Sequence, residues 1–410
     1  MDVKDILRQK GVAFPDFGSV YVGPEVDPQR IAGEGVIIHP GCRVSGAETL
    51  ILAGAELGAE GPATVRDCAV GPRAKLLSGS FSGAVFLEGA SAGPAAHVRP
   101  GTILEEGASA AHASGLKHTI LFPFVTLGSL VNFCDCLMAG GTGPRDHSEV
   151  GSSYIHFNFT PQGDKATASL LGDVPRGVML RERPIFLGGQ GGLVGPAKIA
   201  YGSVLAAGSV WRRDICEENR LWTAGRPGRD AGLPFVPGLY RSPARVVRAN
   251  VHYMASLAAL MAWHHFARGL FLRQGLDRAL LTALVTTVRL GLSERLKRMN
   301  EVAQKMPASA QLLQNQDEPP ANLLAQTREI AEKWRQAAGA LRETAGDPDR
   351  FAPPPAFLEA LARARDRNGG GYVEAVKSLS SEDAATGSAW LSAIVSAASD
   401  AALSRLPLLR

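Results

Sequence analysis

The chain has 410 residues, more than one compact core usually holds, so we expect two or three domains. It carries 43 Lys and Arg against 39 Asp and Glu, and this net charge of +4 is too small to indicate a nucleic-acid partner. Glycine is abundant at 46 residues, while aromatic residues make up only 6% of the chain. This composition favours a tightly turning backbone with a narrow interior.

Three features predict a cytoplasmic protein without a membrane partner. The five cysteines are scattered and odd in number, as expected for reduced thiols. The N-terminal residues MDVKDILRQKG carry charges throughout, unlike a signal peptide. The most apolar stretch, residues 254–272, is interrupted by His264, His265 and Arg268, so we interpret it as a buried helix.

Residues 1–30 form the first expected unit. They hold a short helix candidate over residues 3–10, followed by a lead-in rich in proline and glycine. The end of a repetitive structure must be covered, because unpaired strand edges otherwise attract other chains. We therefore expect residues 1–30 to form an N-terminal cap.

Small apolar or β-branched residues recur every six positions in the following stretch. The clearest run is Ala92, Val98, Leu104, Ala110 and Leu116. A helix would repeat such residues every three or four positions, and an ordinary strand every two. A six-residue period is the signature of a hexapeptide β-helix, in which short strands wind into triangular coils. We expect this β-solenoid over residues 31–235.

Two segments interrupt the repeat, over residues 136–148 and 174–184. Loops that leave a regular prism are the usual place for a binding site. Cys134 and Cys136 flank Asp135 just before the first interruption, but no further cysteine or histidine follows at ligand spacing. We predict no metal there.

Prolines and glycines between residues 227 and 243 mark a change of composition, after which Ala, Leu, Arg and Glu recur at helical spacing. Helices are expected over residues 244–272, 276–305 and 321–345, within an all-α domain that covers residues 236–410. The pair His264 and His265 lies on an apolar helix, where adjacent side chains point about 100° apart. Packing explains this pair better than metal binding.

Residues 96–230 resemble the acetyltransferase half of the bifunctional enzyme that makes UDP-N-acetylglucosamine. The segments HVRPGTILEEGA, SSYIHFNFTPQGDKATASLLGD and GGLVGPAKIAYGSVLAAGSVWRRD match, in order, that family's opening coil, asparagine-containing loop and closing coils. The resemblance implies a left-handed β-helix, a homotrimer, and acetyl transfer from acetyl-CoA to glucosamine-1-phosphate. No segment matching the family's uridyltransferase half opens the chain, and the helical domain is foreign to the family.

The resemblance carries over several site residues. It implies that Arg99 and Lys117 bind the sugar phosphate, and their eighteen-residue separation places them one coil apart on the same face. An arginine fork and a lysine so stacked would clamp a phosphate group. Asn158 and Lys165 match the next sugar-binding loop. The substrate positions are thus Arg99, Lys117, Ser129, Asn132, Asn158 and Lys165, and the acyl-CoA positions are Gly189, Ala207 and Arg226.

Several of these positions depart from the family pattern. Ser129 aligns with the family's histidine general base and Asn132 with a tyrosine, while Glu149 aligns with an asparagine. Phe159 takes the place of a tyrosine, and Gly189 that of a coenzyme-contacting serine. Acyl transfer to an amine requires a group that accepts the proton, and a serine alone does not do so near neutral pH.

Three histidines are candidates to replace the base. In residues 154–159, polar and apolar side chains alternate, which predicts that His156 and Asn158 share one face. His147 is followed by Glu149, a possible orienting carboxylate. His118 adjoins Lys117, but alternation predicts that it faces the opposite way. We take His156, His147 and Glu149 as catalytic candidates; the alternative for each histidine is a surface or structural role.

Three functions remain open at this point. The first is an acyltransferase with a rebuilt site, possibly transferring an acyl group from acyl-CoA to the nitrogen of an amino-sugar phosphate. The second is a non-catalytic module that binds a sugar nucleotide. The third is a trimeric scaffold whose helical domain recruits a partner. Fold alone does not choose among them; we take the first as the working hypothesis.

Overall fold

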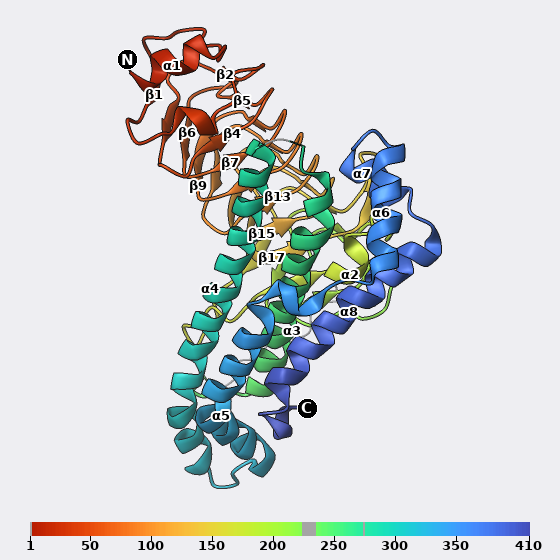
Figure 1. Ribbon diagram of the computed structural model, residues 1–410. Coiled ribbons are helices and arrows are strands. Elements are labelled where there is room, and N and C mark those ends of the chain that lie inside the picture. The colour runs from red at the N-terminus through yellow and green to blue at the C-terminus, as the bar shows by residue number, and fades with distance from the viewer. Residues whose placement is uncertain (1, 224–234, 274) are drawn as a thin grey trace.

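The computed structural model describes residues 2–223, 235–273 and 275–410. A parallel β-helix occupies the first half of the chain, and a helical region follows it (Figure 1). Helix α1 (Val3–Gln9) lies at the N-terminal end of the prism, and the first strand, β1, already begins at Tyr21. The predicted hexapeptide left-handed β-helix followed by helices is confirmed.

The strands of the β-helix form three faces, here named A, B and C, which the chain visits in that order. Face A contains β2 (Ile37–Ile38), β5 (Glu56–Leu57), β8 (Lys75–Leu76), β11 (Ser91–Ala92), β14 (Ser109–Ala110), β16 (Thr126–Leu127), β20 (Glu149–Val150), β23 (Phe186–Leu187), β26 (Val204–Leu205) and β28 (Leu221–Trp222). Face B contains β1 (Tyr21–Val22), β3 (Arg43–Ser45), β6 (Ala63–Arg66), β9 (Gly79–Ser82), β12 (Ala96–Val98), the first halves of β15 (Gly115–Leu121) and β17 (Asn132–Met138), β21 (Ile155–Phe157), β24 (Gly192–Val194) and β27 (Val210–Trp211). Face C contains β4 (Leu50–Ile51), β7 (Ala69–Val70), β10 (Val85–Phe86), β13 (Ile103–Leu104), the second halves of β15 and β17, β22 (Ser169–Leu171) and β25 (Lys198–Ile199).

The turns between faces stack into three edges, the A–B, B–C and C–A corners. Strands β15 and β17 pass around the B–C corner without a break, so that β15 pairs with β12 before the corner and with β13 after it. His118 and Asp135 form the bends of these two strands, with φ values of 48° and 59°. The C–A corner carries the hairpin of β18 (Gly141–Gly143) and β19 (Asp146–His147), and the short helix α2 (Val174–Gly177).

The interior of the prism is filled by the residues that repeat with a period of six. Val98, Leu104 and Leu116 are fully buried, and Ala92 and Ala110 are at most 3% exposed. In the parallel ladder, each inward residue stacks on its counterpart in the next coil, as Val98 does on Leu116. Burial of such side chains is worth roughly 1.5–3 kcal/mol each. The period thus marks the core.

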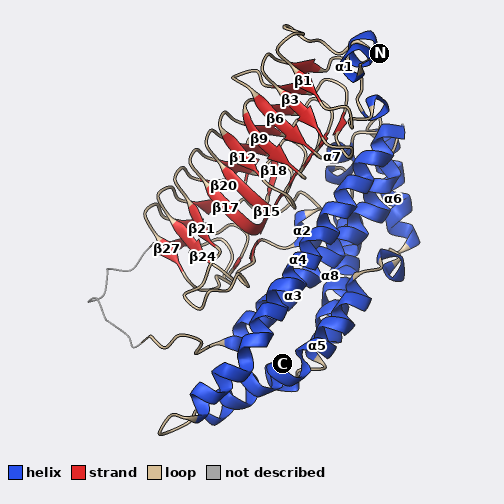
Figure 2. Cartoon of the chain, turned by 90° about the vertical axis from the view of Figure 1, so that its left-hand side faces the viewer, coloured by secondary structure: helices blue, strands red, loops and turns tan. Residues whose placement is uncertain are grey.

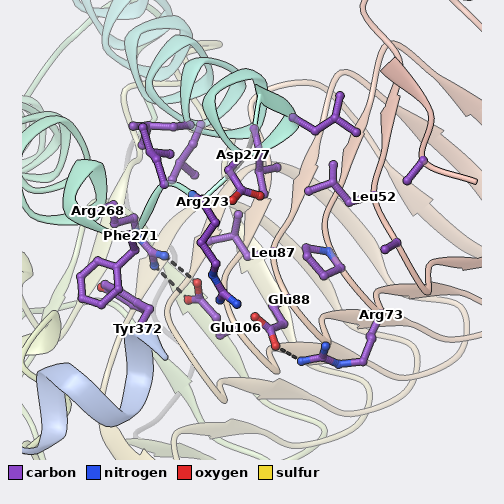
Figure 3. Close-up of a pocket in the computed structure, with 18 residues that line it drawn as sticks. Leu52, Arg73, Leu87, Glu88, Glu106, Arg268, Phe271, Arg273, Asp277 and Tyr372 are labelled. Carbon is purple, nitrogen blue, oxygen red and sulfur yellow. Dashed lines mark hydrogen bonds and ion pairs between the residues drawn. The ribbon is translucent and has the colours of Figure 1, made fainter. Parts of the chain in front are cut away.

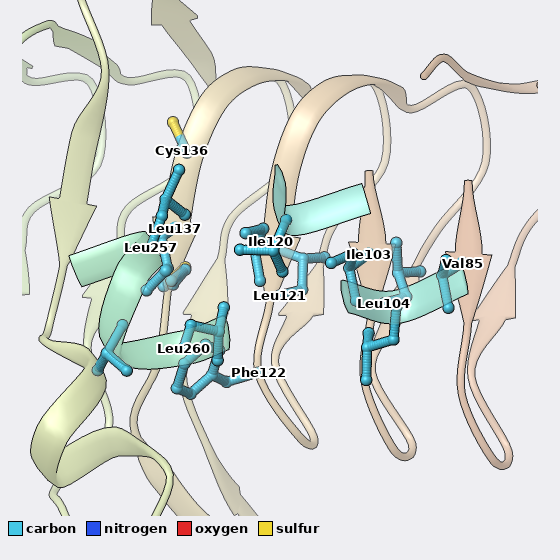
Figure 4. Close-up of a cluster of buried hydrophobic side chains, with 14 of the residues drawn as sticks. Val85, Ile103, Leu104, Ile120, Leu121, Phe122, Cys136, Leu137, Leu257 and Leu260 are labelled. Carbon is cyan, nitrogen blue, oxygen red and sulfur yellow. The ribbon is translucent and has the colours of Figure 1, made fainter. Parts of the chain in front are cut away.

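Face C differs from the other two because its outward-pointing residues are also apolar. Val85, Ile103, Ile120 and Leu137 alternate with inward residues, yet each is at most 3% exposed. Leu257 and Leu260 of a helix pack over this row (Figure 4). Face C is therefore the side on which the helical region lies, and Figure 2 shows the helices running along one side of the prism.

The helical region consists of a few long helices and several short ones. They are α3 (Pro243–Ala262), α4 (Gly275–Gln314), α5 (Ala321–Ala345), α6 (Pro355–Arg367), α7 (Tyr372–Lys377) and α8 (Ser381–Leu403). The first expected helix ends at Ala262 instead of residue 272, because a π turn and a 3-10 turn follow it. The second continues through Pro307 to Gln314. Among the described helices, none is long and apolar enough to cross a lipid bilayer.

Candidate functional site

A small cavity of about 130 Å³ lies where helix α4 passes the B–C corner of the prism. It brings together five of the six predicted substrate-binding residues, which are Arg99, Lys117, Asn132, Asn158 and Lys165. Helix α4 adds Glu294, Arg295 and Arg298 to its lining. We call this cavity the cationic pocket. No sequence pattern indicated the contribution of α4, because these residues follow the strands by more than a hundred positions.

The coils of the β-helix place the first two cations. Arg99 directly follows β12, and its backbone N–H donates to the carbonyl of Leu116 in the next coil at 2.9 Å. Lys117 lies in β15, in register with Cys134 of β17. Stacked coils lie about 4.8 Å apart. The parallel strand pairing thus places Arg99 and Lys117 on neighbouring coils, as predicted.

The charges around the pocket are unequally paired. Arg295 is paired with the buried carboxylate of Asp135 at 2.6 Å, and Arg298 with Glu294 at 2.7 Å. In the part of the chain that the structure describes, no carboxylate pairs with Arg99, Lys117 or Lys165. Cations that converge without partners attract an anion. The pocket therefore has the electrostatics of a phosphate or carboxylate site.

Neutral polar groups complete the lining. The buried Nε of Arg99 has no hydrogen-bond partner among the described residues, and its Nη2 donates to Cys134 Sγ at 3.4 Å. Burial raises the pKa of the Cys134 thiol, which donates to Oδ1 of Asn132 at 3.2 Å. Asn158 Nδ2 donates to Oδ2 of Asp135 at 2.9 Å. These bonds hold both amides in place next to the unpaired cations.

His118 also lines the cationic pocket, beside Lys117, so the prediction that the two face opposite ways is wrong. The reason is the left-handed backbone of His118, with φ of 48°, which turns the strand at the corner and breaks the alternation. Its ring packs against Gly101, where φ is +80° and an added Cβ would collide with Nδ1. Burial lowers the pKa of His118.

His156 lies inside the prism, away from the pocket. Its Nδ1 is 2.6 Å from the carbonyl oxygen of Cys134, and its Nε2 is 2.8 Å from Ser169 Oγ. Burial lowers its pKa to about 4. The predicted common face with Asn158 is wrong, because β21 ends at Phe157 and Asn158 belongs to the loop that follows. Because both ring nitrogens are hydrogen-bonded inside the prism, the surroundings of His156 are those of a structural residue.

His147 and Glu149 lie together in a separate cavity of about 470 Å³ at the C–A corner. His147 Nδ1 is 3.0 Å from the carbonyl oxygen of Pro144. In the described structure, no hydrogen bond joins the side chains of His147 and Glu149. The cavity contains none of the predicted substrate-binding residues. The structure therefore does not bring these two candidates to the cationic pocket.

Ser129, the sixth predicted substrate residue, lies at the A–B corner, where its Oγ is 2.8 Å from Nδ1 of His112. His112 is not among the histidines predicted from the sequence. The signal was available, since His112 precedes Ser129 by seventeen residues, close to the one-coil separation that relates Arg99 to Lys117.

The A–B corner continues from Ser129 to the predicted acyl-CoA positions. Backbone hydrogen bonds join successive turns, from Ser153 N–H to Ser129 O at 2.8 Å and from Gly208 N–H to Gly189 O at 2.9 Å. Ala207 is exposed on the last of these turns. Gly189 is closely packed, and a Cβ added there would lie 2.9 Å from Ser152 O. Arg226 lies outside the described residues.

A larger cavity of about 330 Å³ lies between the C–A corner and the N-terminal part of α4 (Figure 3). Most of its wall is apolar, including Leu52 and Leu87. At its ionic end, Arg268 donates to the carboxylate of Glu106 at 2.6 and 2.9 Å, and Arg268 also pairs with the buried Glu105. None of the predicted site residues that the structure describes lines this cavity, whose ion pairs join the helical region to the prism.

Comparison with known proteins gives a partial match. No protein-family model matches the chain. The bifunctional protein GlmU of Pelobacter propionicus is 28% identical over 210 residues, which cover 51% of this chain and 40% of that protein. GlmU of Nocardia farcinica is 29% identical over 205 residues, with coverages of 50% and 36%. The chain thus spans about two fifths of the length of these curated relatives.

Two further comparisons cover different shares of the chain. GlmU of Pseudomonas fluorescens is 30% identical over 135 residues, or 33% of this chain and 26% of that protein. Among solved structures, the polysialic acid O-acetyltransferase OatWY matches 52% of this chain and 82% of that chain at 12% identity, with a TM-score of 0.14, too low to carry an argument. The chain is a hexapeptide-repeat protein similar to GlmU over about half its length. The sequence motifs predict this similarity, but only over residues 96–230.

Proposed function

We propose that this protein is an acyltransferase that binds the phosphate group of a sugar phosphate in the cationic pocket and acylates the sugar from an acyl-CoA. The observation that carries the proposal is the convergence of Arg99, Lys117 and Lys165 in one cavity, where none of the three pairs with a carboxylate of the described residues. A phosphate offers the charge and the acceptor oxygens that these groups lack.

The size of the pocket suits one end of such a substrate. Its volume of about 130 Å³ is below the roughly 300–1,000 Å³ of typical small-molecule sites. We infer that the phosphate group occupies the pocket. The sugar ring then extends over face B, past Asn132, an exposed residue of the pocket lining. An amino sugar is the preferred class, since an amine is a good acyl acceptor.

We assign the acyl-CoA to the A–B corner, along the turns that contain Gly189 and Ala207. Small residues on neighbouring coils let a long chain approach the backbone closely. The similarity to GlmU over about half of this chain adds support for this class of reaction. We place this reaction in the cytoplasm, a compartment with which the five free cysteines are compatible.

We also propose that the protein is a homotrimer. Ile155, Phe157 and Val210 of face B are 41%, 39% and 42% exposed, and Ile155 and Val210 lie in register on either side of Gly192. Apolar side chains gathered on one face mark an association surface. Association through face B would cover them next to the cationic pocket. Light scattering should give three times the mass of 43.2 kDa; a monomer at micromolar concentration would contradict this part of the proposal.

The first test is calorimetric titration of the full chain with glucosamine-1-phosphate, glucosamine, UDP-N-acetylglucosamine and acetyl-CoA. We expect binding of the sugar phosphate and of acetyl-CoA, with glucosamine at least tenfold weaker because it lacks the phosphate. Binding of the sugar nucleotide alone would instead favour the non-catalytic module. If neither glucosamine-1-phosphate nor UDP-N-acetylglucosamine binds, the proposed use of the cationic pocket is wrong.

A further inference from the structure

His112 and Ser129 form a hydrogen-bonded pair on neighbouring coils at the A–B corner. Nδ1 of His112 is 2.8 Å from Oγ of Ser129. The backbone fixes their separation, since the N–H of Leu130 donates to the carbonyl of His112 at 3.0 Å. The backbone N–H of Ser129 is itself held by Ser152 Oγ at 3.3 Å. The imidazole is thus attached to a rigid part of the prism.

The free side of the imidazole faces an accessible surface. His112 is exposed, and in the described structure no group hydrogen bonds to its Nε2. It lines an open cavity whose other walls include Ser109, Ala111 and Thr126 of face A. Such small side chains leave room for a ligand beside the ring. When Nδ1–H donates to Ser129 Oγ, Nε2 carries a lone pair and acts as a proton acceptor.

The other histidines near the candidate site are less suited to this role. Both ring nitrogens of His156 are occupied inside the prism. Nδ1 of His118 is buried, packs against Gly101 and has no hydrogen-bond partner within the described ranges of the chain. His147 lies in the cavity at the C–A corner, apart from the cationic pocket. Of these four, only His112 combines an accessible ring nitrogen with a side chain that orients the ring.

His112 lies within reach of a substrate held in the cationic pocket. It precedes Gly115 by three residues, and Gly115 is in register with Asn132, which lines the pocket. Three residues of chain span at most about 10 Å. Ser129 precedes Asn132 by the same interval. A sugar whose phosphate lies beside Lys117 and whose ring crosses face B therefore points its far end toward the A–B corner.

We propose that His112 is the general base of the acyl transfer and that Ser129 is its positioning residue; this inference rests on the proposed function. The amine nitrogen of the sugar attacks the thioester carbonyl carbon, so that a C–N bond forms and the C–S bond breaks. Nε2 of His112 accepts the proton that the amine loses, and the imidazolium returns it to the departing thiolate. Coenzyme A leaves as the free thiol.

The test measures transfer from acetyl-CoA to glucosamine-1-phosphate by full-length wild type, His112→Ala and His265→Ala. A general base contributes about 10²–10⁴ to the rate. We expect His112→Ala to lower kcat at least about thirtyfold, while the calorimetric Kd for glucosamine-1-phosphate and the melting temperature stay at wild-type values. His265, which is exposed and pairs with Asp349 in the helical region, is the matched control and should leave kcat unchanged. A smaller loss in His112→Ala would overturn the inference.

Ser129 requires a readout that separates positioning from folding. We expect Ser129→Ala to lower kcat with little change in KM, and Ser129→Thr, which keeps the hydroxyl, to restore most of the loss. If Ser129→Thr is as slow as Ser129→Ala while both melt like the wild type, the positioning role is wrong.

Different results would contradict the proposed acyl transfer and the proposed role of His112. A wild-type protein that binds both ligands without transferring the acyl group contradicts the proposed activity and this inference together. An active wild type whose His112→Ala variant remains active contradicts the role of His112 alone. Loss of glucosamine-1-phosphate binding in His112→Ala would show that the ring binds substrate, and would also overturn its assignment as a base.

Discussion

Arg295, in the middle of α4, donates a hydrogen bond to Oδ1 of Asp135 at 2.6 Å, although 160 positions separate the two residues. The side chains are 2% and 5% exposed. Arg295 also donates to the carbonyl of Lys165 at 3.1 Å, and Asp135 accepts from Asn158. One arginine of the helical region therefore connects the bend of β17 with the loop that carries two predicted substrate residues.

Replacing Arg295 with alanine should destabilise the protein by about 3–5 kcal/mol, because Asp135 would stay buried without a partner. Urea unfolding of the full chain measures this change. Arg298→Ala is the matched control one turn further along α4. Its partners, Glu294 and Glu301, belong to the same helix, and such pairs contribute about 0.3–0.5 kcal/mol. Equal losses in the two variants would contradict a special role for the pair of Arg295 and Asp135.

The double variant Arg99→Ala/Lys117→Ala should bind glucosamine-1-phosphate at least tenfold more weakly, which corresponds to about 1.4 kcal/mol. The reason is the loss of two of the three unpaired cations of the pocket. Titration calorimetry at constant ionic strength gives the Kd. Lys75→Ala removes a cation from face A, where Lys75 pairs with Glu56, and should leave the Kd unchanged. Unchanged binding in the double variant would show that the phosphate binds elsewhere.

Ala207→Trp should weaken acetyl-CoA binding at least about tenfold, because an indole at this exposed turn occupies the edge assigned to the coenzyme. Ala59 is also exposed at the A–B corner, between β5 and β6, and lies seven coils away, about 34 Å at the usual strand spacing. Ala59→Trp is therefore the control for the same change at the same edge. Fluorescence or calorimetric titration compares the affinities of the two variants for acetyl-CoA. Similar affinities would show that acetyl-CoA does not bind at this edge.

The buried carboxyl of Glu105 predicts a pH-dependent stability. Burial raises its pKa to about 7 from an ordinary value of 4.5, although Arg268 opposes the shift. The other neighbours are Glu106, which pairs with Arg268, and His264, whose pKa burial lowers well below its usual value. Between these two values of the pKa, the folded protein holds a proton that the unfolded chain releases, so this group's contribution to stability falls as the pH rises.

We therefore expect wild type to lose stability relative to Glu105→Gln as the pH rises from about 4.5 to 7, since glutamine cannot ionise. The measurement is urea unfolding of both proteins across this range. The difference in free energy of unfolding should change most steeply midway between these two pH values and level off above about pH 7. Parallel curves for the two proteins would mean that Glu105 ionises equally in the folded and unfolded states.

Leu260→Ala should destabilise the protein by about 2–5 kcal/mol, the usual range for a fully buried leucine. Leu260 packs over face C near Phe122, so its loss leaves a cavity between the helices and the prism (Figure 4). Leu290→Ala is a control on α4, where the side chain is 44% exposed and the expected change is within about 0.5 kcal/mol. A small effect at Leu260 would indicate that the two regions separate before they unfold.

The β-helix could be predicted from the sequence because its core repeats locally. Val98, Leu104 and Leu116 occupy equivalent inward positions, and each coil needs only its neighbours to be recognised. The same logic places Arg99 above Lys117. Applied to every coil, it would also have found His112 beside Ser129.

The errors have two physical origins. Alternation fails at His118 and after Phe157, because the chain turns a corner in one case and leaves the prism in the other. The part played by Arg295 depends on how a distant helix docks, which no local period encodes. A signal for the docking face was nevertheless present, because strands covered on both sides contain consecutive apolar residues, as in Ile103-Leu104.

The apolar outer row of face C has a consequence for how the protein is made. The β-helix emerges first during synthesis, and it then exposes Val85, Ile103, Ile120 and Leu137 until α3 and α4 arrive. A gene fragment that ends near residue 235 would leave this strip uncovered permanently, and its product should aggregate on expression. The boundary between strands and helices is therefore a poor place to divide the gene. The helices of the same chain cover the apolar strip and so protect the prism from aggregation.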